Sequence, residues 1–279
     1  MSFDYYYPVN ITNKRVVYCK ELKNKHIITL QKYLETTDNE IICDSFESLI
    51  KDIVKENYNL NYIDKFLILL SLRKNSLGKT LDLKVGNSKN SVSITEIENK
   101  ILENYTNINF KIEYDIFKIK LGAPIKLNYY DSFYFNINEI EMDNNKVIMN
   151  NLSDIEFEEY LDCLPFDLLK IIKDKTKKIK YKLFSLFTVM KDDEKINYHF
   201  SFKHEEIFNL LKLVFSDNLK NILYNQYVCA SKLYIPPNNF NEMSPGETKL
   251  ILKHYINELE KQKESRSGGI PPGLGNKPS

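Results

Sequence analysis

The stretch NYIDKFLILLSLRKNSLG, residues 61–78, decides the fold. Its apolar residues lie on most sides of a helix, so we expect the central buried helix of the chain here rather than a surface helix. Gly78 stands where a helix commonly ends in a left-handed residue, a conformation that glycine adopts at little cost. The stretch therefore predicts a buried helix that ends at Gly78.

The residues before this helix predict a short β segment and two amphipathic helices. Residues 3–19 are rich in aromatic and β-branched residues around a turn at 10–13, which is typical of a β start. Apolar residues then recur at helical spacing in two segments. The first holds Leu22, His26, Ile27, Leu30, Tyr33 and Leu34, and the second holds Ile42, Phe46, Leu49, Ile50, Ile53 and Val54.

After Gly78 the hydrophobic period changes from helical to alternating. TLDLKVGNSKNSVSI, residues 80–94, contains a Gly-Asn pair and predicts a hairpin. Residues 107–130 add two more alternating segments, and Ile137 and Ile140 continue the pattern. We therefore expect residues 79–150 to be rich in β structure.

Helical patterns return at SDIEFEEYLDCL, residues 153–164, where Ser153 and Glu156 form a capping box. A second helix is predicted from Phe166, a strand at 194–202, and two helices at 204–216 and about 218–231. Pro236 and Pro237 indicate a hinge.

The C-terminal stretch NEMSPGETKLILKHYINELEKQ, residues 241–262, predicts an amphipathic helix. Ser244 suits the N-cap, Pro245 suits the first helical position, and Glu247 completes a capping box. The Gly and Pro residues beyond 265 predict disorder. The expected apolar face holds Leu250, Ile251, His254, Tyr255 and Leu259.

Together these patterns predict an α+β protein. Its helical N-terminal unit would carry a β-rich insertion, followed by a mainly helical C-terminal unit and a disordered tail. The predicted parts are a helix and β-rich domain at 1–150, a helical domain with a small strand element at 151–235, a hinge and C-terminal docking helix at 236–264, and a disordered tail at 265–279.

Composition excludes several classes of function. A net charge of +1 gives no electrostatic reason to expect nucleic acid or an anionic membrane as the main partner. The four cysteines lie far apart without a Cys-x-x-Cys pair, and no secretion signal is visible. We therefore expect a reduced, cytoplasmic protein.

No motif indicates catalysis or a bound cofactor. The histidines lack the converging ligands that a metal needs, so we expect no metal. The acidic residues at 154–162 suit a helix start better than general acid–base catalysis. The lysines of 170–182 interleave with apolar residues, as on a solvated helix face, although contact with an acidic partner stays open.

Three stretches resemble the baseplate hub and tail-assembly proteins of T-even-type contractile-tailed bacteriophages. In that family an Asp, an apolar run, Leu-Arg and Ser-x-Gly lead into a β insertion. SDIEFEEYLDCLPFDLLKII, residues 153–172, resembles its acidic helix before a Leu-rich helix. Met243, Pro245 and Glu247 match a Met-x-Pro-x-Glu segment of related tail-assembly chaperones. The residues that match the first stretch are Asp64, Leu72, Arg73, Ser76 and Gly78.

One departure from the family concerns zinc. Some relatives carry Cys-x-x-Cys knuckles in their β insertions. The corresponding places here read KVGNSKNS at 84–91 and TVMKDDEK at 188–195, without cysteine. A structural zinc ion is therefore not expected.

The resemblance, which covers most of residues 1–262, implies a non-enzymatic, chaperone-like assembly factor for the tail baseplate hub. It implies hub, tape-measure or baseplate subunits as partners. It also implies a location in the host cytoplasm during assembly, and in the tail baseplate of the virion if the chain stays there after assembly. Two alternatives stay open: a basic protein- or nucleic-acid-binding module that uses 170–182, and an enzyme whose site is formed by distant residues. The candidate partner-binding residues are Met243, Pro245, Glu247, Leu250, Tyr255 and Leu259.

Overall fold

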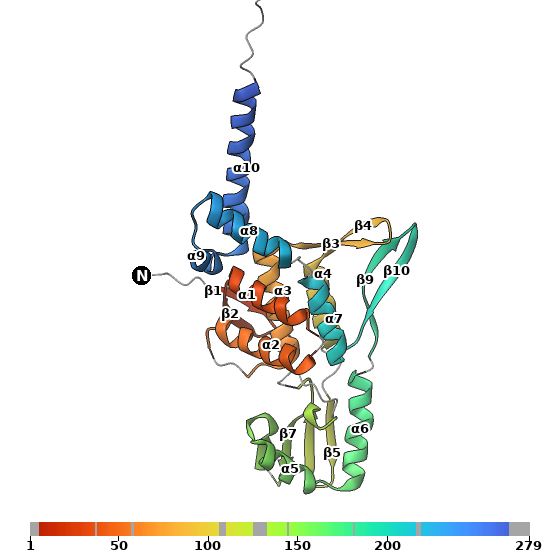
Figure 1. Cartoon of the computed structure of the whole chain (residues 1–279). Coiled ribbons are helices and arrows are strands. Elements are labelled where there is room, and N and C mark those ends of the chain that lie inside the picture. Colours follow the sequence, from red (N-terminus) through yellow and green to blue (C-terminus); the bar gives the residue numbers. More distant parts are fainter. Residues whose placement is uncertain are drawn as a thin grey trace, which may run out of the picture.

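The computed structural model describes residues 6–36, 38–56, 59–105, 110–124, 133–143, 145–180, 182–215 and 219–267. Helices and antiparallel strands are mixed along the chain, which confirms the α+β prediction. In the middle of Figure 1 several helices gather around one helix, α3 (Tyr62–Leu77), and a four-stranded sheet lies below them.

Helix α3 is the central helix, as its sequence predicts. Every residue from Tyr62 to Leu70 is buried. The helix begins with a capping box, in which the Asn61 side chain accepts the Asp64 N–H at 2.9 Å and the Asp64 carboxylate accepts the Asn61 N–H at 3.3 Å. Because apolar groups cover all its sides, α3 is packed by neighbours all round.

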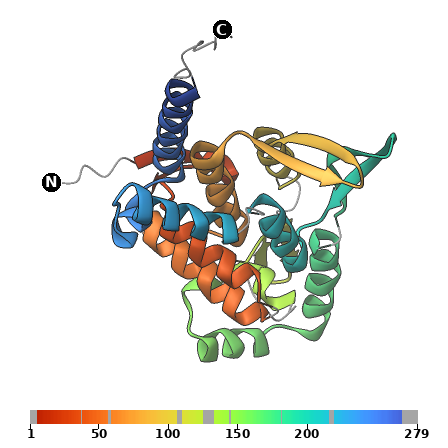
Figure 2. The same ribbon diagram turned by 45° about the horizontal axis from the view of Figure 1, so that its top comes forward.

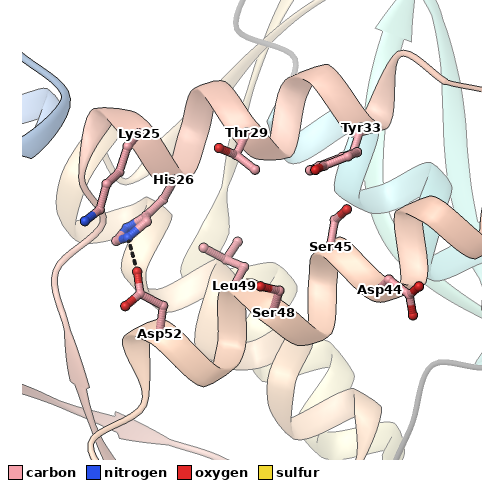
Figure 3. A pocket seen from close by; sticks show the side chains of 9 residues that line it. All are labelled: Lys25, His26, Thr29, Tyr33, Asp44, Ser45, Ser48, Leu49 and Asp52. Carbon is pink, nitrogen blue, oxygen red and sulfur yellow. Dashed lines mark hydrogen bonds and ion pairs between the residues drawn. The ribbon is translucent and has the colours of Figure 1, made fainter. Parts of the chain in front are cut away.

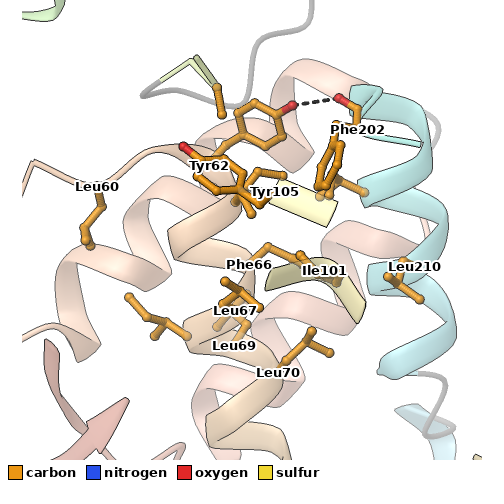
Figure 4. Packing of buried hydrophobic residues seen from close by; sticks show 14 of the residues in the cluster. Leu60, Tyr62, Phe66, Leu67, Leu69, Leu70, Ile101, Tyr105, Phe202 and Leu210 are labelled. Atoms are coloured by element: carbon orange, nitrogen blue, oxygen red, sulfur yellow. Dashed lines mark hydrogen bonds between the residues drawn. The ribbon is translucent and has the colours of Figure 1, made fainter. Parts of the chain in front are cut away.

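The packing around α3 joins parts that are far apart in the sequence (Figure 4). Phe66 and Leu70 lie among side chains from α4 (Ile94–Tyr105) and α7 (His204–Val214), including Ile101 and Leu210. The Tyr62 hydroxyl, which is buried, donates to the Phe202 carbonyl at 2.7 Å. The core is therefore built from both halves of the chain.

Two buried polar groups fix the ends of α3. Asp64 accepts from Thr12 N–H at 3.0 Å and pairs with Arg15 at 2.6 Å, which holds the β start against the helix. At the other end Arg73 donates to the carbonyls of Val214 at 3.1 Å and Gly78 at 2.7 Å. Asp64 and Arg73, two of the residues that carry the sequence resemblance, therefore have structural roles.

Gly78 ends α3, but not in the predicted left-handed helical conformation. Its φ of 123° and ψ of 161° lie in a region that is essentially restricted to glycine. Because the chain passes directly from α3 into an extended strand, Gly78 has the ψ angle of a strand residue and not that of a helical residue.

The β start and the first two helices match the prediction. Strand β1 (Tyr6–Asn10) pairs antiparallel with β2 (Val16–Lys20). The turn between them is a short 3₁₀ segment, η1 (Thr12–Lys14). Helices α1 (Asn24–Leu34) and α2 (Asn39–Ile53) follow and bury the predicted apolar faces.

Residues 79–150 are less purely β than predicted. The expected hairpin is present as β3 (Thr80–Val85) and β4 (Ser88–Ser93). Helix α4 follows directly, and the prediction missed it. The antiparallel sheet β5-β6-β7-β8 then comprises β5 (Phe110–Tyr114), β6 (Phe117–Leu121), β7 (Ile137–Met142) and β8 (Asn145–Ile148), with 3₁₀ segments η2 (Phe133–Asn136) and η3 (Met149–Asn151).

The second half holds further helices and a second hairpin. The predicted strand at 194–202 is β10 (Glu194–Phe200), and it pairs with β9 (Phe184–Lys191), which the prediction missed. The predicted hinge contains a short helix, α9, because Pro236 and Pro237 suit a helix start. The helices are α5 (Asp154–Asp162), α6 (Phe166–Lys180), α7, α8 (Leu219–Lys232), α9 (Pro237–Glu242) and α10 (Pro245–Ser267).

Buried side chains form a main cluster that runs from Val9 to Phe215. It includes Leu168 and Ile172 of α6, so the buried contacts continue across the predicted boundary between 150 and 151. The division into domains at that point stays a prediction. A second, small cluster holds the C-terminal elements.

Candidate docking surface

The residues 219–267, comprising α8, α9 and α10, form what we call the C-terminal cap. Its small cluster joins Cys229 of α8 and Phe240 of α9 to Ile28 on α1. Leu252 of α10 packs against the same cluster. Such a satellite cluster holds less apolar area than the main core, so the cap has its own, weaker attachment.

A buried asparagine ties this cap to α1. Asn24 donates from its side-chain amide to the Phe240 carbonyl at 2.9 Å and to the Thr248 hydroxyl at 2.7 Å. Its backbone N–H donates to the Met243 carbonyl at 2.9 Å. Because Asn24 and Thr248 are buried, these bonds fix the start of α10 in direction as well as position.

The predicted capping box begins α10. The Ser244 N–H donates to the Glu247 carboxylate at 2.7 Å, and the Glu247 N–H donates to the Ser244 hydroxyl at 3.3 Å. Pro245 is the first helical residue and is buried. The prediction of this helix start is confirmed in each of these residues.

The rest of α10 extends away from the body of the protein (Figures 1 and 2). It runs to Ser267 instead of 264, and residues 268–279 of the predicted tail lie outside the described residues. From Lys253 onward the described side chains are exposed, except that of Tyr255, which is half-buried. At 1.5 Å per residue this projecting part is about 22 Å long.

The six candidate partner-binding residues fall into two groups. Pro245 and Glu247 serve the helix start, and Met243 accepts the bond from Asn24, so these three residues have roles in folding. Leu250 is 58% exposed and Leu259 is 37% exposed, whereas Tyr255 is half-buried. The second group is therefore available to a partner.

The expected apolar face of α10 agrees with the structure at Ile251 and Tyr255, which are half-buried, and differs at Leu250. Leu252 faces the body and packs on the small cluster, whereas Leu250 points into solvent. Thr248, one turn before Leu252, is the buried neighbour on the same side. The contact with Asn24 selects this side, and that contact depends on residues more than two hundred positions away.

Sequence reasoning missed an aromatic patch on α8 and the loop after it. Tyr224 and Tyr227 are each 64% exposed, and Leu223 is exposed beside them on the helix. Tyr234 follows α8 with a φ of 56° and is also exposed. The spacing of Tyr224 and Tyr227 on one helix face was the available signal. Exposed tyrosines of this kind are typical of protein–protein contacts.

A cavity of about 480 Å³ opens between α1 and α2 and is the strongest candidate for a small-molecule site (Figure 3). His26 and Asp52 lie at one end, and small polar side chains such as Ser48 line the wall. A His, an Asp and a Ser in one cavity require a test for hydrolase chemistry.

The hydrogen bonds of His26 argue against that chemistry. Its Nδ1 accepts the Lys23 N–H at 3.0 Å, so the proton lies on Nε2, which donates to Asp52 at 2.8 Å. No lone pair is left on the ring to take a proton from Ser48. Burial lowers the pKa of His26, which favours this neutral form. The dyad therefore caps α1 rather than activating a nucleophile.

Two hairpins that are about one hundred residues apart in the sequence meet at their tips. The tips of the β3–β4 and β9–β10 hairpins lie together in both views (Figures 1 and 2). Asn90 exchanges two hydrogen bonds with the backbone of Met190, at 2.6 and 2.9 Å, and Asp192 accepts the Asn87 N–H at 3.2 Å. These hydrogen bonds hold the two hairpin tips together.

Gly86 permits this close approach. Its φ is 59°, and a Cβ built on it would lie 2.8 Å from an Asp192 carboxylate oxygen. In the part of the chain that the structure describes, no group of three or more His, Cys, Asp or Glu residues could hold a metal ion. The four cysteines are free, and Cys163 alone among them is exposed.

Comparisons with family models, curated proteins and solved structures found no match to this chain. Within the described ranges, no helix has the length and apolar character needed to cross a membrane.

Proposed function

We propose that this chain is a non-enzymatic assembly factor of a contractile phage tail, and that it binds hub, tape-measure or baseplate subunits through the C-terminal cap. The observation that carries the proposal is the combination of a fixed base and an exposed apolar surface. Asn24 fixes the direction of α10 at its start. Leu250, Tyr224 and Tyr227 then present apolar area to solvent.

This arrangement suits reversible docking. A fixed helix loses little conformational entropy when a partner binds, so its apolar side chains contribute more fully to affinity. Tyrosines supply a large contact area with few rotatable bonds. The cap thus presents a prearranged surface instead of a segment that must first fold.

The phage setting rests on the resemblance of the three matching stretches. Residues 84–91 and 188–195 are where this chain departs from the family, because they lack its cysteines. In the structure these segments lie against each other through Asn90, Met190 and Asp192. The host cytoplasm and the tail baseplate remain the proposed locations.

A basic binding module is the second candidate. On α6 the solvent face carries Lys170, Lys173, Lys177 and Lys178, all exposed. Asp167 and Asp174 lie on the same face, and Asp174 is 3.9 Å from Lys177. These carboxylates reduce the positive potential, so this helix face is a weaker candidate than the cap.

Co-expression of this chain with phage tail proteins tests the proposal. The full chain is compared with the variant Leu250→Ser, at the exposed base of α10, and with the variant Tyr224→Ser/Tyr227→Ser on α8. We expect tail structural proteins to co-purify with the full chain and to be reduced with both variants. Recovery of no tail protein with the full chain would overturn the assembly function.

A further inference from the structure

One face of α10 continues from the folded body into solvent. Leu252, Tyr255, Ile256 and Leu259 follow at spacings i, i+3, i+4 and i+7, which places them on one side of the helix. Leu252 packs on the small cluster. Ile256 is 51% exposed and Leu259 is 37% exposed, although they lie on the same side. The intramolecular interface therefore continues as an apolar stripe without a cover from the described chain.

The stripe has the register of a coiled-coil seam. With Leu252 and Leu259 at a positions, Tyr255 takes the d position and Ile256 the e position. Glu258 then takes the g position, and Lys263 takes the e position of the following heptad. In a parallel pair of helices, a g residue of one copy faces the e residue of the next heptad in the other copy. Two such pairs would form, because Glu258 of each copy would face Lys263 of the other.

The two charged residues of this contact lie on the surface of the helix. Glu258 and Lys263 are both exposed. They are five residues apart, so they point away from each other on their own helix and form no i, i+4 pair. The flanking apolar residues agree with the register, because Ile251 at g would face Ile256 at e of a second copy.

An antiparallel pair fits less well. In an antiparallel pair a positions face d positions, so Leu259 of one copy would face Tyr255 of the other. The residues beyond Leu259 in each helix would then lie against the base of the other copy, where Leu252 packs on its own small cluster and Thr248 is buried. A parallel pair keeps both bases at the same end and leaves the intramolecular contacts intact.

We propose that the projecting part of α10 pairs in parallel with α10 of a second copy of this chain. Tyr255, Ile256 and Leu259 form the contact, and Glu258 pairs with Lys263 of the other copy. The seam lies on the opposite side of α10 from Leu250. It therefore leaves that side and the α8 tyrosines for another protein, and it does not depend on the proposed function.

The test is the mass of the purified full chain, measured by sedimentation equilibrium over a wide range of protein concentration. We expect the mass to rise from the 32.9 kDa monomer to the dimer as concentration increases. Glu258→Lys replaces two attractions by two repulsions and is expected to weaken the dimer about tenfold. The charge swap Glu258→Lys/Lys263→Glu is expected to restore it.

Two further variants control for folding and for the site. Leu259→Ser should abolish the dimer, whereas Leu250→Ser, on the other side of α10, should leave it unchanged. Circular dichroism checks that each variant keeps its helix content. A monomer at every concentration would overturn the proposal. The proposal would also be overturned if Leu259→Ser left the dimer affinity unchanged. The same holds if the double variant Glu258→Lys/Lys263→Glu dimerised as weakly as Glu258→Lys alone.

Discussion

Asn24→Ala should detach the C-terminal cap without unfolding the core. The substitution removes two buried hydrogen bonds, at 2.9 Å to Phe240 and 2.7 Å to Thr248. Each bond contributes about 1 kcal/mol net, and the Phe240 carbonyl keeps a second donor, the Met243 N–H at 3.2 Å. We therefore expect the opening free energy of the cap to fall by about 2 kcal/mol.

Native-state amide hydrogen exchange measures this loss directly, element by element. A fall of about 2 kcal/mol corresponds to exchange about 30-fold faster at α9 and at the start of α10. Amides of α3, which belong to the main cluster, should keep their protection. Lys25→Ala is the matched control, because its pair with Glu242 at 2.9 Å is exposed and contributes less than about 1 kcal/mol.

Two results would refute the reasoning on Asn24. If protection in α9 and α10 did not change, the polar network would not hold the cap. If protection fell equally in α3, the cap would not be a separate unit and its small cluster would be part of the main core.

The remaining predictions concern the core, a glycine and a histidine. Leu69→Ala, at a fully buried position, should lower the unfolding free energy by about 2–5 kcal/mol in denaturant titrations. Gly78→Ala should lower the unfolding free energy by about 1–3 kcal/mol through backbone strain alone, because the added Cβ would meet no atom within 4 Å. An unchanged denaturation midpoint would contradict this strain. The folded pKa of His26 lies below its unfolded value of 6.5, so the stability from neutral His26 is present above pH 6.5 and is lost as pH falls through the folded pKa. The melting temperature should therefore fall less between pH 7 and pH 5 in His26→Gln than in the wild type. The control His254→Gln, at an exposed site, should behave like the wild type.

The sequence predicts the local features well, because local patterns determine them. The buried helix at 61–78 is apolar on most sides, and both predicted capping boxes, at Ser153 and Ser244, lie within four residues. The hairpin around Gly86 follows from its turn residues and alternation. Each of these elements carries its signal within its own segment.

The errors have two physical origins. Helix α4 was missed although Ile94, Ile97 and Ile101 keep helical spacing, because β-branched residues also favour strands. The prediction that Leu250 belongs to the packed face of α10 was wrong for a different reason. Asn24 decides which side of α10 faces the body, and no local pattern in 241–262 contains that contact.

The most direct measurement is photo-crosslinking in cells where the phage tail assembles. A photoreactive residue replaces Tyr227 on α8 or Leu250 on α10, and Phe166, which is 80% exposed on α6, serves as the matched control site. The account predicts crosslinks from Tyr227 and Leu250 to a hub, tape-measure or baseplate subunit, and none from Phe166. Equal crosslinking from Phe166, or no tail protein at either cap position, would contradict the docking role of the C-terminal cap.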